Sequence, residues 1–194
     1  MPRFTTSDGL SLYYEDQGAG RPILCLAGLT RNARDFDFVA PHLGDLRLLR
    51  LDHLGLERVT ILGTSRGGLI AMALAAGHGD RLQGVVLNDI GPEVTPIGLE
   101  RIMDYVGKPP NAPTLDEAAQ ALKAVSEAQF PGVPLTRWRA QAGAMFEEQS
   151  GGGLALRYDP KLRDALIGQA GVGEAPDLWL LFDALKEVPL AVIR

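Results

Sequence analysis

The stretch Ile61–Ile70, ILGTSRGGLI, joins two apolar segments of different character. The residues before it, RVT at 58–60, continue into ILG as a short apolar run typical of a buried strand. The residues after it, LIAMALAAG at 69–77, favour a helix. Gly63, Ser65 and Gly67 meet the pattern G-x-S-x-G, which places a serine on a sharp turn at the end of a strand. The stretch therefore predicts an exposed, nucleophilic Ser65.

The same order of strand, turn and helix occurs elsewhere in the chain. Apolar runs at 22–28 (PILCLAG), 82–90 (LQGVVLNDI) and 188–194 (VPLAVIR) predict further buried strands. Alternating strands and helices indicate an α/β fold with a mostly parallel sheet and helices on both faces. Between 96 and 187 polar and apolar residues mix at helical spacing, and Thr114 with Glu117 predicts a helix start. We expect a core formed by 1–95 and 188–194, with 96–187 inserted as a helical cap.

Composition excludes several classes of protein. The chain has 194 residues, 46% of them hydrophobic, enough for one sizeable core. Its net charge of −5, with scattered basic residues, argues against a nucleic-acid partner. No apolar segment suits a signal peptide or a membrane span, so we expect a cytoplasmic protein. Cys25 is the only cysteine and lies in an apolar run, which predicts an inert buried thiol and no cysteine metal cluster.

The chain resembles the α/β-hydrolase superfamily of serine esterases and lactonases. The resemblance lies in the Ser65 turn, the strand-end turn LAGLTRNARDF and the segment NDIGPEV. This resemblance implies a small-molecule acyl substrate, no cofactor and no metal. It also implies two oxyanion-binding backbone N–H groups, those of Arg66 and Leu29. The less favoured alternative for Leu29 is an ordinary turn residue. The Arg66 side chain could lie on the surface or reach toward a polar group of the substrate.

A serine needs a histidine base, and the histidine needs a carboxylate to orient it. In the superfamily the chain order is serine, acid, histidine. His42 and His53 precede Ser65, and His78 follows the helix that leaves it, so none is expected near the serine. Asp89 is a weak candidate for the acid, and a turn-capping role before Gly91 and Pro92 is the favoured interpretation. The resemblance thus implies that the C-terminal strands carrying the acid and histidine are lacking, and that this chain is inactive or impaired.

A second gap precedes the serine. LRLLRLD at 46–52 resembles the superfamily's fourth strand, and LDHLGLERV at 51–59 resembles the end of the helix before the nucleophile strand. The helix itself is lacking. About six residues, reaching roughly 20 Å, would have to return along a strand of similar length. We therefore expect that the two strands cannot both occupy their usual places. We also expect an exposed apolar sheet edge at PLAVI, which could promote self-association.

Other functions fit the sequence less well. A non-catalytic small-molecule binding module on the same fold is the main alternative, because aromatic residues in the cap could line an apolar pocket. Haloalkane removal and epoxide opening would normally require aspartate at the position of Ser65. Ester, lactone or related acyl hydrolysis through Ser65 remains the leading hypothesis.

Overall fold

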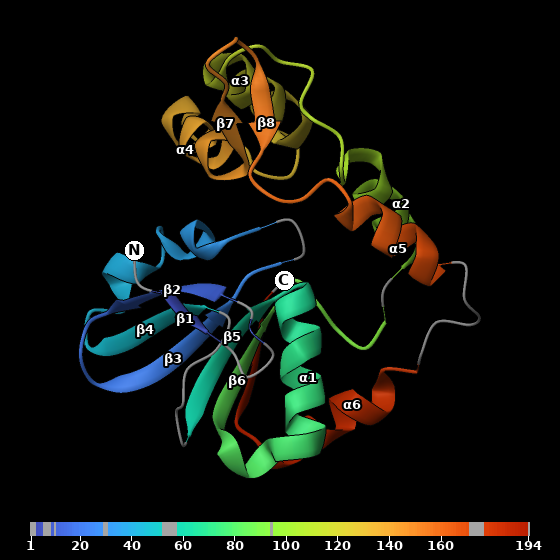
Figure 1. Ribbon diagram of the computed structural model, residues 1–194. Coiled ribbons are helices and arrows are strands. Elements are labelled where there is room, and N and C mark those ends of the chain that lie inside the picture. The colour runs from blue at the N-terminus through green and yellow to red at the C-terminus, as the bar shows by residue number, and fades with distance from the viewer. Residues whose placement is uncertain are drawn as a thin grey trace. The chain divides into compact units, whose positions relative to one another are not determined.

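A computed structural model describes residues 3–5, 9, 11–28, 31–51, 58–93, 95–170 and 177–193. The chain divides into two compact units (Figure 1). Unit 1 combines Met1–Val94 with Pro176–Arg194, and unit 2 comprises Thr95–Ala175. Unit 2 is therefore an insertion within the sequence of unit 1. No helix among the described ranges is long and apolar enough to cross a membrane.

Unit 1 is built on a seven-stranded sheet with the order β1-β2-β4-β3-β5-β6-β9. The strands are β1 (Arg3–Thr5), β2 (Ser11–Gln17), β3 (Arg21–Leu26), β4 (Leu46–Leu51), β5 (Val59–Thr64), β6 (Leu82–Asn88) and β9 (Leu190–Ile193). The pairs β1–β2 and β2–β4 are antiparallel, and the other four are parallel. This arrangement confirms the predicted mostly parallel α/β sheet.

Both faces of the sheet are covered. The helix α1 (Arg66–His78) packs on one face, beside β5 and β6 (Figure 1). Its Ala71 and Met72 are fully buried in the core that it forms with these strands. Three short 3₁₀ helices, η1 (Ala33–Phe36), η2 (Ala40–His42) and η3 (Gly79–Arg81), complete the first half of the unit. Phe36 of η1 packs with Cys25 of β3 in a separate cluster. Alternate residues of β3 pack into different clusters on the two faces of the sheet. Because both faces of the strand are covered, its sequence is a continuous apolar run.

The expectation that the fourth strand and the nucleophile strand cannot both occupy their usual places is wrong. β4 pairs in parallel with one side of β3, and β5 pairs in parallel with the other. The seven Cα steps from Leu51 to Arg58 can reach about 25 Å when extended, so the estimate of 20 Å was too strict. The predicted lack of a helix between these strands concerns residues 52–57, which lie outside the described residues.

Unit 2 is mainly helical. Its elements are α2 (Pro96–Tyr105), α3 (Leu115–Ser126), α4 (Leu135–Met145), β7 (Phe146–Glu148), β8 (Leu154–Leu156) and α5 (Leu162–Ala170). The helices α3 and α4 pack together through the small buried residues Ala118, Ala119 and Ala142, which allow close approach. As predicted, Thr114 caps α3, and its hydroxyl oxygen accepts a hydrogen bond from the Glu117 N–H at 3.2 Å.

The segment after unit 2 differs from the sequence prediction, which extended the inserted region to residue 187. The helices α6 (Trp179–Asp183) and η4 (Ala184–Glu187) belong to unit 1. Leu185 is 1% exposed and joins the core that α1 forms with the sheet, and Phe182 packs against the same core. Apolar residues at helical spacing here thus serve the main core. The following strand β9 is an edge strand whose Leu190, Val192 and Ile193 are exposed.

Candidate active site

Ser65 lies between the last residue of β5 and the first residue of α1, and its backbone adopts φ 50° and ψ −115°. A residue other than glycine held at positive φ typically costs about 1–3 kcal/mol. Three backbone hydrogen bonds hold it there. The Ser65 N–H donates to the Asn88 carbonyl (3.1 Å), and the Ser65 carbonyl accepts from Gly68 (2.9 Å) and Leu69 (3.3 Å). The neighbouring strand and the helix start therefore fix the strained turn.

The glycines around Ser65 are required by close backbone approach. A Cβ at Gly63 would lie 2.6 Å from the Gly67 carbonyl carbon, and a Cβ at Gly67 would lie 2.3 Å from the Leu26 carbonyl oxygen. Real Cβ atoms essentially never come closer than 3.0 Å to such atoms. Both glycines of the G-x-S-x-G pattern thus allow the helix start to pack directly on β5 and β3, as the pattern predicts.

The surroundings of Ser65 suit an oxyanion. Arg66 is the first residue of α1, where backbone N–H groups lack intrahelical acceptors and the helix dipole is positive. Gly28, in the turn after β3, is buried, and a Cβ on it would lie 3.5 Å from the Ser65 Cβ. The turn predicted to supply the second donor therefore borders the serine. The donor itself, Leu29, lies outside the described residues.

Asp89 lies near Ser65 in the sheet. The residues that precede them, Asn88 and Thr64, are register partners in β6 and β5, and their side chains are hydrogen-bonded at 3.1 Å. Asp89 is exposed and, like Ser65, has a positive φ (51°). Its N–H donates to the Ile193 carbonyl at 2.9 Å. The geometry is that of a turn residue at the carboxyl edge of the sheet, close to the nucleophile strand.

The described histidines lie far from Ser65. His78 ends α1, so 13 residues at 1.5 Å each place it about 20 Å along the helix from the serine. His42, in η2, lies four residues before β4 begins, at the opposite edge of the parallel strands. His53 lies outside the described residues. Neither described histidine is placed to accept the Ser65 proton.

Cys25 is buried, with 2% exposure, and burial raises the pKa of its thiol to about 12. Such a thiol stays protonated at neutral pH and is a poor nucleophile. Cys25 is therefore no competitor to Ser65.

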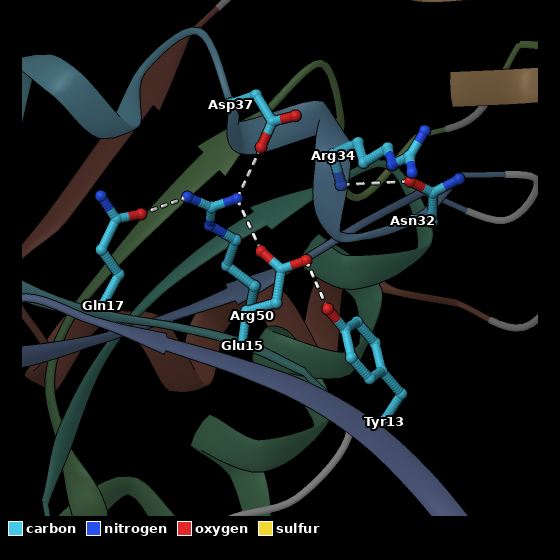
Figure 2. Close-up of polar contacts among 7 residues, drawn as sticks. All are labelled: Tyr13, Glu15, Gln17, Asn32, Arg34, Asp37 and Arg50. Carbon is cyan, nitrogen blue, oxygen red and sulfur yellow. Dashed lines mark hydrogen bonds and ion pairs between the residues drawn. The ribbon is translucent and has the colours of Figure 1, made fainter. Parts of the chain in front are cut away.

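The structure shows one buried charge that the sequence analysis missed. Arg50, on β4, is 5% exposed and donates to Glu15 (2.8 Å), Gln17 (2.7 Å) and Asp37 (2.6 Å), as Figure 2 shows. The Tyr13 hydroxyl donates to the same Glu15 carboxylate at 2.6 Å. The signal in the sequence was the alternation of Tyr13, Glu15 and Gln17 on β2, beside which β4 places Arg50. Period-two spacing places these side chains on one face of paired strands.

The comparisons with known proteins agree with this fold. A family model described as "alpha/beta hydrolase fold" matches residues 19–162. The chain therefore belongs to the α/β-hydrolase fold family. It is 33% identical over 222 residues to the 3-hydroxybutyrate-oligomer hydrolase of Cupriavidus necator, an alignment covering 94% of this chain and 75% of that protein. The chain is also similar to the crystal structure of an α/β hydrolase from Novosphingobium aromaticivorans, with 38% identity and a TM-score of 0.86. The match covers all of this chain and 80% of the Novosphingobium chain.

Proposed function

We propose that Ser65 is the nucleophile of a serine hydrolase that acts on esters, lactones or related acyl substrates. The observation that carries this proposal is the strained backbone of Ser65 at the junction of β5 and α1. Strain at a site that neighbouring backbone over-determines is common where a side chain must be held for chemistry. The membership of the α/β-hydrolase family and the hydrolase relatives support it.

In the proposed reaction the Ser65 Oγ attacks the substrate carbonyl carbon while its proton passes to a base. The carbonyl electron pair moves to oxygen, where the N–H groups of Arg66 and Leu29 would stabilise the negative charge. Collapse of this intermediate breaks the bond to the leaving alcohol, which takes up a proton. Water then hydrolyses the acyl-serine. The relative from C. necator is named for oligomers of 3-hydroxybutyrate, so esters of short hydroxy acids are the proposed substrates.

We expect this chain to be a poor catalyst because it lacks a base near Ser65 among the described residues. Neither described histidine, His42 or His78, lies near Ser65, so this chain is proposed to be inactive or severely impaired. Removal of the base from a serine triad typically lowers the rate by 10⁴-fold or more. Binding and the oxyanion donors would account for what activity remains.

A fluorophosphonate probe tests both parts, with the C. necator hydrolase as the reactive control. We expect this chain to be labelled about 10⁴-fold more slowly than the control, and only on Ser65, as read by mass spectrometry. Equal labelling of a Ser65→Ala variant would refute Ser65 as the nucleophile. Labelling within a hundredfold of the control would show that a base is present. A chain that is never labelled on Ser65 but binds small esters would instead be a binding module.

A further inference from the structure

A cavity of about 240 Å³ in unit 1 lies next to the Ser65 turn, because Arg66, the residue after the serine, lines it, although Ser65 itself does not. The carboxyl ends of β3 and β4, the loop residues 31–33 and the first turns of α1 form its walls. Three arginines line it, namely Arg31, Arg50 and Arg66. None of its lining residues is acidic. The cavity is therefore lined by guanidinium groups, of which those of Arg31 and Arg50 also pair with carboxylates outside its lining.

Two of these arginines lie near the serine. Arg66 follows it in the chain, and its side chain lines the cavity together with Ile70, one helical turn further along α1. The position that a Cβ on Gly28 would occupy is 3.5 Å from the Ser65 Cβ and 3.4 Å from the Arg31 Cγ. The stem of Arg31 therefore lies close to Ser65, on the side of the turn after β3.

Donor groups of the cavity remain available. Asp35 accepts hydrogen bonds from Arg31 only at Nε (2.8 and 2.9 Å), and within the described ranges the two terminal nitrogens of Arg31 have no hydrogen-bond partner. Arg66 forms no ion pair with any residue that the structure describes. Arg50 differs, because Glu15, Gln17 and Asp37 occupy its terminal nitrogens. Among the described residues, Arg31 and Arg66 therefore have free terminal guanidinium nitrogens, whereas on Arg50 only the buried Nε lacks a partner.

We propose that this cavity binds a free carboxylate of the substrate, so that the preferred substrates are esters of short carboxylic acids that carry a second, ionised carboxyl group. This inference rests on the proposed role of Ser65. Guanidinium groups bind carboxylates through paired, charge-assisted hydrogen bonds. Leu26, Ala27 and Ile70 supply apolar wall for the short carbon chain between the carboxylate and the ester.

The size of the cavity limits this substrate. Typical small-molecule pockets have volumes of about 300–1,000 Å³, somewhat above the 240 Å³ found here. A short acid fits such a space better than a long fatty chain. The sequence allowed the Arg66 side chain either to lie on the surface or to reach a polar group of the substrate. In this proposal it binds the carboxylate of the substrate.

The test measures binding to the Ser65→Ala chain, which removes turnover. Monoethyl succinate, ionised at pH 7.5, is compared with neutral diethyl succinate by NMR titration. We expect the half-ester to bind at least tenfold more tightly. Arg31→Gln and Arg66→Gln should each weaken half-ester binding about tenfold and change diester binding less than twofold, because only the half-ester uses the guanidinium charge. Arg47→Gln is the matched control, since Arg47 lies at the start of β4 and pairs with Asp16. It should change neither affinity.

Equal affinities for half-ester and diester would overturn the inference, as would unchanged half-ester binding in both arginine variants. If Arg31→Gln fails to fold because Asp35 loses its partner, Arg66→Gln decides alone, since Arg66 is exposed. Tighter competition by inorganic phosphate than by the half-ester would refute the assignment to a carboxylate. Fluorophosphonate labelling of Ser65 is measured separately. Arginine-dependent binding without labelling would therefore refute the proposed function and leave only a carboxylate-binding cavity. Labelling without such binding would support the proposed function and refute this inference.

Discussion

The contact between the start of α1 and β3 predicts a large difference between two glycine-to-alanine substitutions in one helix. A Cβ at Gly67 would lie 2.3 Å from the Leu26 carbonyl oxygen and 2.8 Å from the Leu26 carbonyl carbon and Cβ. To reach the 3.0 Å limit for real Cβ contacts, the helix start and β3 must separate by at least about 0.7 Å. Because two of these three atoms belong to the backbone, rotation of a side chain cannot relieve the clash. Gly77, near the other end of α1, has no atom within 4 Å of its Cβ position.

The expected magnitudes follow from these contacts. Gly77→Ala should stabilise the protein by about 0.5–1 kcal/mol, because alanine loses less backbone entropy than glycine in a helix. Gly67→Ala gains at most the same backbone-entropy stabilisation. Forcing the start of α1 away from β3 typically costs about 1–3 kcal/mol. With the cost at the upper end of that range, the net destabilisation is about 2 kcal/mol. The two variants should differ in the free energy of unfolding by roughly 3 kcal/mol.

Urea unfolding followed by circular dichroism measures this difference, with the slope of free energy against urea compared among variants to check that unfolding remains two-state. Gly67→Ala should also slow fluorophosphonate labelling of Ser65, since the shift moves the serine relative to Gly28. Gly77→Ala should leave labelling unchanged. If Gly67→Ala is as stable as Gly77→Ala, the close approach of α1 to β3 is not present in the protein and the argument from the glycine pattern fails.

Three further results are expected. Replacing Glu15 and Asp37 together by Gln and Asn should destabilise the protein by about 3 kcal/mol in urea, more than Arg50→Met, because it leaves a buried cation unpaired. Cys25 should resist iodoacetamide at pH 8 until the protein unfolds. Burial raises the pKa of Cys25 from 9.0 to about 12, so its contribution to stability is complete below pH 9 and is lost as the pH rises toward 12. Cys25→Ala should abolish this loss when the free energy of unfolding is measured against pH. Thr114→Ala should lower stability by about 1 kcal/mol in thermal unfolding of the chain, through loss of the α3 cap.

The sequence predicted the parts of the site that depend on neighbouring residues. Gly63, Ser65 and Gly67 lie within five positions, and the steric demands of a strand-to-helix turn act over that same distance. Their spacing therefore predicted the strained serine and the tight packing around it. The cap at Thr114 was predictable for the same reason, because its hydrogen bond spans three residues.

The predictions that failed depended on distant parts of the chain. Chain reach alone suggested that β4 and β5 could not both flank β3, whereas the structure pairs both strands with it. The apolar spacing of the segment around Leu185 predicted a helix correctly but could not tell which core the helix joins. Periodicity states which residues share a face, and tertiary packing decides what that face contacts.

The sequence by itself determined the α/β class of this protein and the position of its candidate nucleophile, because alternating segments and a five-residue turn carry that information locally. Only the tertiary structure brought Arg31, Arg50 and Arg66 to one cavity beside Ser65. They arrive there from a loop, a strand and a helix whose positions are set by pairing across the sheet. A local sequence pattern cannot predict that these three side chains lie close together, because their proximity depends on contacts between segments far apart in the chain.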